Sequence, residues 1–454
     1  MRNRKAIALF AILAIFAAAC GGGSTADEVV EEAPETTEAP ATTAAPTTTA
    51  APVETADPLI LASLMPLSGD LAFLGPGIAL GATLAIEHVN AAGGVNGQPV
   101  VWLEGDSGCD GAVALTSLQD VIAQGAQGVM GAACSGTSLA ILDTAIGAGV
   151  VMVSPSNTSP QFTKMDKKGL YARTAPSDLL QGQVLAGLLV DDGRESISII
   201  SRADSYGRGL AEATASAFEA AGGVVNTIVY HATDATEFSA EVTAVGKGSV
   251  DAIVSILFPE TGCGVLGVAY EQGLLDTPWY FTDGVKDAQL DSNCGLNGAL
   301  DGMKGTAPGA AAGEAMTRFS AAYSGVSEDG SETFIFAPQA YDAVMLMVLS
   351  AIANGVTGSE IGAGLAAASG GGTPCIGVDC MPLAAAGEDF DYVGASGDIM
   401  LDANGDPTAA TYDIWQISGD ENPTLESVDF KPVSYTHLRA HETVLDLVCR
   451  LLLE

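Results

Sequence analysis

Two hydroxyl-rich segments carry the side chains best suited to bind a small molecule. The segments are Cys134–Ser138 and Ser154–Pro160, and each follows a short apolar run. Buried parallel strands read as such runs, and in open α/β sheets ligands bind beyond the carboxyl ends of the strands. Hydroxyls and free backbone N–H groups at this edge favour a carboxylate. The same residues also make turns and helix N-caps, so both interpretations stay open at this point.

The elements that must position these segments alternate between strand-like and helix-like patterns. A first series predicts strands at 59–65, 100–104, 128–130 and 150–153, with helices near 77–92, 112–124 and 137–147. A second series, after Arg173–Pro176, predicts strands at 196–201, 224–230, 251–258 and 279–282, with helices near 178–190, 206–221, 237–246 and 262–272. Apolar residues recurring from Phe336 to Ala351 predict a later helix with one stripe facing a core. We therefore expect an α/β chain with two domains of the same design.

The amino terminus has the pattern of an export signal. Basic residues precede an apolar stretch at 6–16, and small residues at 17–19 lead to Cys20. The apolar stretch is shorter than the roughly 20 residues that span a bilayer. The small residues before Cys20 resemble the bacterial lipoprotein cleavage box, in which the cysteine becomes lipidated. Residues 21–57 are rich in Thr, Ala, Pro and Glu, a composition too polar to bury a core, and predict a tether.

Charge and length limit the classes of partner. The chain has 454 residues and a formal net charge of −38, with 17 basic against 55 acidic residues. This balance repels phosphate backbones and anionic lipid heads, so we expect no nucleic-acid partner. The acidity needs no partner to explain it, since it also keeps an exported protein soluble.

The cysteines fit an oxidising compartment. Of the eight, Cys20 is assigned to the lipid and Cys449 lies in an atypical tail, which leaves six. Pairing neighbours along the chain gives Cys109 with Cys134, Cys263 with Cys294 and Cys375 with Cys380. Each bridge would add about 2 to 4 kcal/mol, although spacing alone does not fix connectivity. Zinc is the competing use, but the sequence has no Cys-x-x-Cys and only four histidines.

A family resemblance extends over about residues 59–430. The motifs that carry it are Leu64–Gly69, Asn90–Gly97, Asp106 with Cys109, Gly131–Ser138, Ser154–Pro160, Arg173–Ala175, Asp204–Gly209, Asp283–Gly284 and Pro338–Ala343. In this order they resemble the substrate-binding proteins of branched-chain amino-acid ABC transporters. The resemblance implies a type I periplasmic binding protein fold, in which two Rossmann-like lobes joined by three crossovers close over a ligand.

The resemblance also implies domain bounds. These are a signal peptide at 1–20, a linker at 21–57, a first lobe at 58–175 with 307–398, a second lobe at 176–306 with 399–432, and an atypical tail at 433–454. The crossovers would lie near Thr174, Thr306 and Asp398. The tail resembles a translated sequencing-adapter artefact joined to a chain cut short near Pro432; an amphipathic partner-binding helix is the alternative.

Site roles follow from the same resemblance. Ser135 would hold a ligand carboxylate, Thr158 would add a second hydroxyl, and the carbonyl of Asn157 would accept from an α-ammonium. Asp283 would face that ammonium, so that both ligand charges meet opposite partners. Phe258 would cap the ligand from the second lobe, and Leu74 would stand against its side chain. The resemblance implies two partners, an amino-acid-like ligand and an ABC permease. It also implies that a lipid anchors the protein to the outer face of the cytoplasmic membrane.

Rival functions remain to be weighed. Gly262–Gly267 fits a GxGxxG fingerprint with Asp283 downstream, which would indicate a dinucleotide, whereas glycines packing a helix on a sheet are the alternative. No G-x-S-x-G occurs and histidines are scarce, so we expect no enzyme and no cofactor. A ligand-sensing receptor domain and a binding protein for short amides or urea stay open as alternatives.

Overall fold

The computed structural model describes residues 57–69, 71–286, 289–327, 334–419 and 421–430. The export signal, Cys20, the linker and the atypical tail lie outside these residues. The strands are β1 (Ile60–Met65), β2 (Val101–Asp106), β3 (Gly128–Gly131), β4 (Val151–Ser154), β5 (Tyr171–Arg173), β6 (Ser196–Arg202), β7 (Val224–His231), β8 (Ala252–Ile256), β9 (Trp279–Phe281), β10 (Lys304–Pro308), β11 (Thr373–Ile376), β12 (Phe390–Gly394), β13 (Gly397–Asp398), β14 (Ala410–Gln416) and β15 (Thr424–Phe430).

The helices connect these strands. They are α1 (Gly75–Ala91), α2 (Gly111–Ala123), α3 (Ser135–Ala148), α4 (Gln161–Lys164), α5 (Asp178–Asp191), α6 (Ser205–Ala220), α7 (Ser239–Val245), α8 (Pro259–Glu271), α9 (Leu290–Asn293), α10 (Glu314–Val326), α11 (Ala337–Asn354), α12 (Gly358–Ala368) and α13 (Met381–Ala386). Short 3-10 turns are η1 (Leu274–Asp276), η2 (Asp283–Val285) and η3 (Gly377–Cys380).

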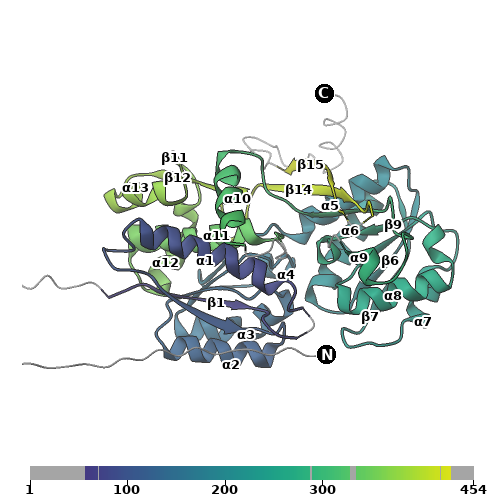
Figure 1. Cartoon of the computed structure of the whole chain (residues 1–454), viewed down its shortest axis with the longest axis horizontal. Helices are drawn as coiled ribbons and strands as arrows, with labels where there is room; N and C mark the ends of the chain where they lie inside the picture. Colours follow the sequence, from purple (N-terminus) through teal and green to yellow (C-terminus); the bar gives the residue numbers. More distant parts are fainter. Residues whose placement is uncertain (1–56, 70, 287–288, 328–333, 420, 431–454) are drawn as a thin grey trace, which may run out of the picture. The chain divides into compact units, whose positions relative to one another are not determined.

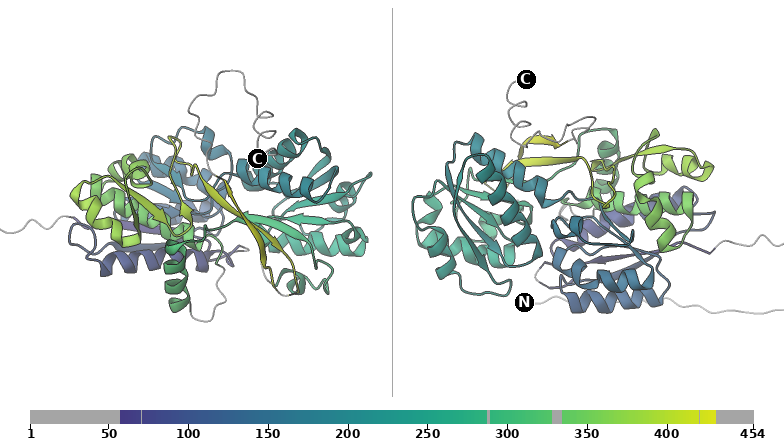
Figure 2. Two further views of the ribbon diagram at one scale, coloured as in Figure 1. Left: turned by 90° about the horizontal axis from the view of Figure 1, so that it is seen from above. Right: turned by 180° about the vertical axis from the view of Figure 1, so that it is seen from behind.

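Two sheets organise these elements. The first has the strand order β2-β1-β3-β4-β5 and is parallel throughout. The second has the order β15-β14-β10-β9-β8-β6-β7, in which β14 and β15 are antiparallel to their neighbours. Figure 2 shows the two yellow strands β14 and β15 running side by side. A small third sheet, β11-β12-β13, accompanies the late helices. The expected α/β fold with two Rossmann-like lobes is confirmed.

The first lobe combines segments that are distant in the sequence. Figure 1 shows the green α11 and α12 beside the purple α1, and these helices pack together in one core. On the other face of the first sheet, α2 and α3 cover a second apolar cluster. The second lobe repeats this sandwich, with α5 and α6 on one face of its sheet and α7 and α8 on the other. Apolar residues on both faces explain the near-continuous apolar runs of the strands.

The chain crosses between the lobes at three places. The first crossover joins β5 to α5, the second follows β10, and the third precedes β14. The second sheet holds β10 as far as Pro308, and Leu401 still packs in the core of the first lobe. The chain therefore changes lobes slightly later than Thr306 and Asp398.

The expected helix with one apolar stripe is buried on every side. Residues 337–351 of α11 are all buried, because α1, α12 and the strands of the first sheet surround the helix. Phe336 is not part of the helix; it precedes it with a φ of 61°. No single helix of the described residues is long and apolar enough to cross a membrane, although α11 and α12, bent by 107°, pass that test together. As α11 is buried in the core, this apolar character is explained by packing.

The glycines of the dinucleotide-like fingerprint lie inside a helix. Residues 262–267 belong to α8, where Cys263 is bridged to Cys294. A Cβ added at Gly264 would come within 2.4 Å of the Phe238 ring, so this glycine permits close packing. A phosphate-binding turn must instead precede its helix. The packing interpretation of these glycines therefore holds.

The two lobes also approach one another closely beside the hydroxyl-rich segments. Gly209 of α6 faces Pro160, and a Cβ added at Gly209 would lie 2.7 Å from the proline Cδ. The contact joins the start of α6 in the second lobe to the end of the Ser154–Pro160 segment in the first.

Candidate functional site

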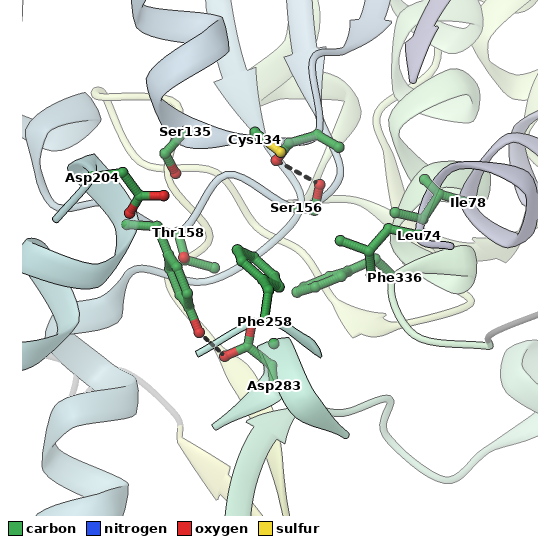
Figure 3. Close-up of a pocket in the computed structure, with 13 residues that line it drawn as sticks. Leu74, Ile78, Cys134, Ser135, Ser156, Thr158, Asp204, Phe258, Asp283 and Phe336 are labelled. Carbon is green, nitrogen blue, oxygen red and sulfur yellow. Dashed lines mark hydrogen bonds between the residues drawn. The ribbon is translucent and has the colours of Figure 1, made fainter. Parts of the chain in front are cut away.

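One pocket draws residues from both lobes. It includes about 480 Å³ of space between atoms, part of which is open to solvent. The first lobe lines it with Leu74, Ile78, Ala133, Cys134, Ser135, Ser156, Thr158 and Phe336, and the second with Asp204, Tyr206, Phe258, Asp283 and Gly284. In the view of Figure 3, Ser135, Thr158 and Asp204 lie on one side of Phe258, and Leu74, Ile78 and Phe336 lie on the other. The pocket therefore has a polar end and an apolar end.

The polar wall of the first lobe is built on the start of α3. Ser135 is the first residue of this helix, and no side chain caps the helix end. The first N–H groups of a helix lack partners within it and carry positive partial charge, so they favour an anion. The Ser135 hydroxyl accepts weakly from Ser159 N at 3.5 Å, which leaves its own proton free to donate. A carboxylate fits this end of the pocket.

Asn157 takes a structural role instead of lining the pocket. Its carbonyl accepts from Arg173 Nη1 at 3.1 Å, and its amide donates to the carbonyls of Ala132 and Ala133. We had expected this carbonyl to face a bound ligand, but Asn157 is not among the residues that line the pocket. Ser156 lines the pocket beside it, while its hydroxyl donates to Ala133 O at 3.0 Å. Asn157 fixes the loop that presents Ser156 and Thr158.

Asp283 is the central acid of the second lobe. It is 6% exposed, and Oδ1 accepts from Gln181 Nε2 at 2.8 Å and from Tyr206 OH at 3.0 Å. Since both side-chain donors reach Oδ1, Oδ2 is the oxygen that a cation can approach. Burial raises the pKa of Asp283, and the hydrogen bonds from Gln181 and Tyr206 oppose that rise. An ammonium group in the pocket would offset the energetic cost of burying this charge.

A second acid lies behind the pocket wall. Asp178, the first residue of α5, is fully buried, and the side chain of Thr158 lies close enough to its carboxyl group to lower the pKa through a hydrogen bond. Burial raises its pKa well above the ordinary value, and the charge of Asp283 adds to the rise. Two close acids do not both ionise easily in a buried site. Because Asp283 has two side-chain donors and Asp178 has one, we assign the negative charge to Asp283.

The apolar end is shaped by two phenylalanines and two aliphatic side chains. Phe258 precedes α8 and Phe336 precedes α11, so both rings come from residues at helix starts. Gly284 makes room for Phe258, because a Cβ there would lie 2.3 Å from Leu257 O and 3.0 Å from the ring. Leu74 and Ile78 complete this wall at the beginning of α1. An aliphatic or aromatic group fits here.

Disulfides stabilise the frame of the site. The structure pairs the six cysteines as expected, with Cα atoms 5.5 Å apart for Cys109–Cys134, 4.8 Å for Cys263–Cys294 and 5.2 Å for Cys375–Cys380. The first bridge holds the loop after β2 against the start of α3. At the end of β2, Asp106 accepts from the backbone N–H groups of Leu67, Ser68 and Gly108, so it also fixes the loop before α1.

The structure brings together most of the expected site residues and adds others. Ser135, Thr158, Asp283, Phe258 and Leu74 all line the pocket. Sequence reasoning missed Ile78, Ser156, Asp204, Tyr206 and Phe336. A signal for Asp204 and Tyr206 was available, since they directly follow β6 and the carboxyl ends of parallel strands meet at one edge.

Comparison with known proteins defines the class. A family profile described as "Periplasmic binding protein" matches residues 58–412. The chain belongs to this family of solute-binding proteins, and the resemblance seen in the sequence is confirmed.

Its relatives are amino-acid-binding proteins by name. The leucine-, isoleucine-, valine-, threonine- and alanine-binding protein of Pseudomonas aeruginosa is 29% identical over 247 residues, which cover 54% of this chain and 64% of the relative. The leucine-specific-binding protein of Salmonella typhimurium is 31% identical over 246 residues, with 53% and 65% covered. The match thus spans slightly less than two thirds of each of these relatives.

Solved structures agree on the fold. The branched-chain amino acid transporter substrate binding protein LivJ from Streptococcus pneumoniae, in complex with isoleucine, has a TM-score of 0.69 at 21% identity, covering 83% of this chain and all of that one. A solute binding protein from R. palustris in complex with benzoate has a TM-score of 0.67 at 17% identity, with 83% and 99% covered. The fold is therefore that of type I periplasmic binding proteins.

Proposed function

We propose that this chain captures an amino acid with an apolar side chain and delivers it to an ABC permease. The observation that carries the proposal is the presence, in one pocket, of the Ser135 helix start, the Asp283 carboxylate and an apolar end. These three features match the carboxylate, the ammonium and the side chain of such a ligand. The names of the relatives support branched-chain amino acids as the first candidates.

We also propose that the protein is exported and that it performs no catalysis. The export pattern at 6–16 and the cleavage-box resemblance at Cys20 support anchoring to the outer face of the cytoplasmic membrane. The hydroxyl, carboxylate and apolar groups lining the pocket match the parts of a bound amino acid, which supports a role in binding.

Ligand screening by isothermal calorimetry tests the proposal. Leucine, isoleucine and valine are compared with 4-methylpentanoate, which lacks the amine of leucine, and with benzoate, acetamide and urea. We expect leucine-type ligands to bind at least about 100-fold more tightly than 4-methylpentanoate, because the latter leaves the buried Asp283 unpaired. Tighter binding of benzoate or 4-methylpentanoate would refute the role of Asp283 and favour a carboxylic-acid receptor. Preference for acetamide or urea would favour the amide-binding alternative.

The variant Asp283→Asn provides the matched control for this screen. It keeps the size of the side chain and removes the charge. If Asp283 recognises the amine, Asp283→Asn loses most of the preference for leucine over 4-methylpentanoate. If the preference survives in the variant, another group binds the amine and the assignment is wrong.

A further inference from the structure

Arg202 lies behind the pocket wall of the second lobe, in contact with Asp204 and Phe258, which line the pocket, and with Glu260, which does not. The residue ends β6 and is 6% exposed. Its Nε donates to Asp204 Oδ2, and its Nη1 donates to Glu260 Oε1 at 2.7 Å. Its guanidinium carbon lies 4.4 Å from the centroid of the Phe258 ring, within the range of a cation–π contact.

Asp204 is the group through which Arg202 affects the pocket. Asp204 lines the pocket, and its carboxylate is drawn toward the pocket interior in Figure 3. Both of its oxygens are occupied: Oδ1 accepts from Gly207 N at 2.8 Å, and Oδ2 is paired with Arg202. Without Arg202, the pocket would hold a second unpaired carboxylate besides Asp283.

Phe258 extends the influence of Arg202 to the apolar end. The ring lines the pocket, and the guanidinium of Arg202 lies against it. A ring that already holds a guanidinium on one face attracts a second cation less strongly. The same arginine thus weakens the attraction for cations at both Asp204 and Phe258.

We propose that Arg202 is a specificity-determining residue that excludes amino acids with a cationic side chain, by pairing with Asp204 and covering the outer face of Phe258. The inference rests on the proposed function and adds the charge class of the accepted ligand. Arg202 does not itself line the pocket and acts through these two residues.

Two single variants test the inference in opposite directions. Arg202→Met removes the charge and frees Asp204, so we expect the lysine-to-leucine ratio of association constants to rise at least about tenfold. Asp204→Asn removes one of the two carboxylates that flank Arg202, so less negative charge faces an anionic ligand and we expect the glutamate-to-leucine ratio to rise in the same way. Asn is a good N-cap and can accept from Gly207 N, so this variant preserves the start of α6.

Controls separate charge selection from a general loss of structure. Arg202→Lys keeps a cation and should retain the wild-type preference, whereas the double variant Arg202→Met/Asp204→Asn should lose the gain for lysine. Calorimetry on the full chain measures all ratios, and a thermal melt checks folding. If Arg202→Met does not fold, the glutamate-to-leucine ratio of Asp204→Asn still tests the inference.

The outcomes are distinguishable from failure of the proposed function. If the wild type binds leucine but neither variant shifts its ratio, the inference about Arg202 is wrong and the proposed function stands. If the wild type binds no amino acid at all, the proposed function itself fails. A gain for lysine that persists in the double variant would also overturn the inference, because Asp204 would not be its source.

Discussion

The two walls of the pocket offer chemically different groups to a ligand. The wall of the first lobe offers hydroxyls and the start of α3, which are uncharged donors set on short loops after β3 and β4. The wall of the second lobe offers ionised side chains held by other side chains, as in the set formed by Asp283, Gln181 and Tyr206. Truncating a buried charge costs more than removing a neutral donor. We therefore expect affinity to depend more on the second lobe than on the first.

The largest expected effect tests this ranking directly. Asp283→Asn should weaken leucine binding at least about 100-fold, because the ammonium loses its buried counter-charge. The ligand-free variant should not be less stable at neutral pH. Burial raises the pKa of Asp283, so stability from this group is present below the ordinary value of 3.8 and is lost as the pH rises through the folded value. Asparagine removes that cost, and calorimetry with thermal melts measures both properties.

Tyr206→Phe sharpens the comparison by weakening the same carboxylate indirectly. The Tyr206 hydroxyl donates to Asp283 and lowers its pKa, so its removal raises that pKa further. Because the ammonium needs the ionised form, binding should fail at a higher pH in the variant than in the wild type as the solution is acidified. At the pH where the wild type has lost half of its affinity, we expect about tenfold weaker binding by the variant. An unchanged pH profile of the dissociation constant would show that Tyr206 does not support the charge.

Ser135→Ala addresses the first lobe. The variant loses the hydroxyl but keeps the backbone N–H groups at the start of α3, so leucine should bind only about 3- to 10-fold more weakly. Ser156→Ala is the matched control, since that hydroxyl already donates to Ala133 O. A loss for Ser135→Ala as large as that for Asp283→Asn would reverse the ranking of the two walls.

The smallest effect reports on Arg202 without any ligand. Burial lowers the pKa of His231, and the charge of Arg202 lowers it further. In Arg202→Met this pKa should therefore rise, although burial keeps it below that of an exposed histidine. Only four histidines occur in the chain, so the proton resonances of His231 can be followed during a pH titration. An unchanged pKa of His231 in the variant would show that the guanidinium charge does not affect this residue at the end of β7.

Much of the fold could be predicted because the strands are buried on both faces. The runs at β1, β3 and β4 are mostly apolar, with Ser63 inside β1 and Ser154 at the end of β4, and the helices between them end near the expected residues. Element ends were less certain: the strand expected to reach Phe258 stops at Ile256, where α8 is about to begin. Periodicity also could not show that α11 is surrounded, since that depends on the later α12.

The site was partly predictable for a physical reason. Ser135 and Thr158 lie in segments whose local composition signals a ligand edge, and Asp283 was found by resemblance. Phe336 was assigned to packing because its apolar spacing matches that of the following helix, yet it ends in the pocket. Asn157 and Ser156 are neighbours in one loop, and only the tertiary contact with Arg173 decides which of them faces the ligand.

The close approach of Gly209 to Pro160 has a practical consequence. Any side chain at position 209 would push α6 away from the facing loop, because a single added carbon would already overlap the ring of Pro160. Substituting Gly209 with valine should hold the two lobes further apart while leaving every residue that lines the pocket unchanged. Under the proposed function, this variant would supply the open, ligand-free form in a homogeneous state, for use as a biosensor scaffold.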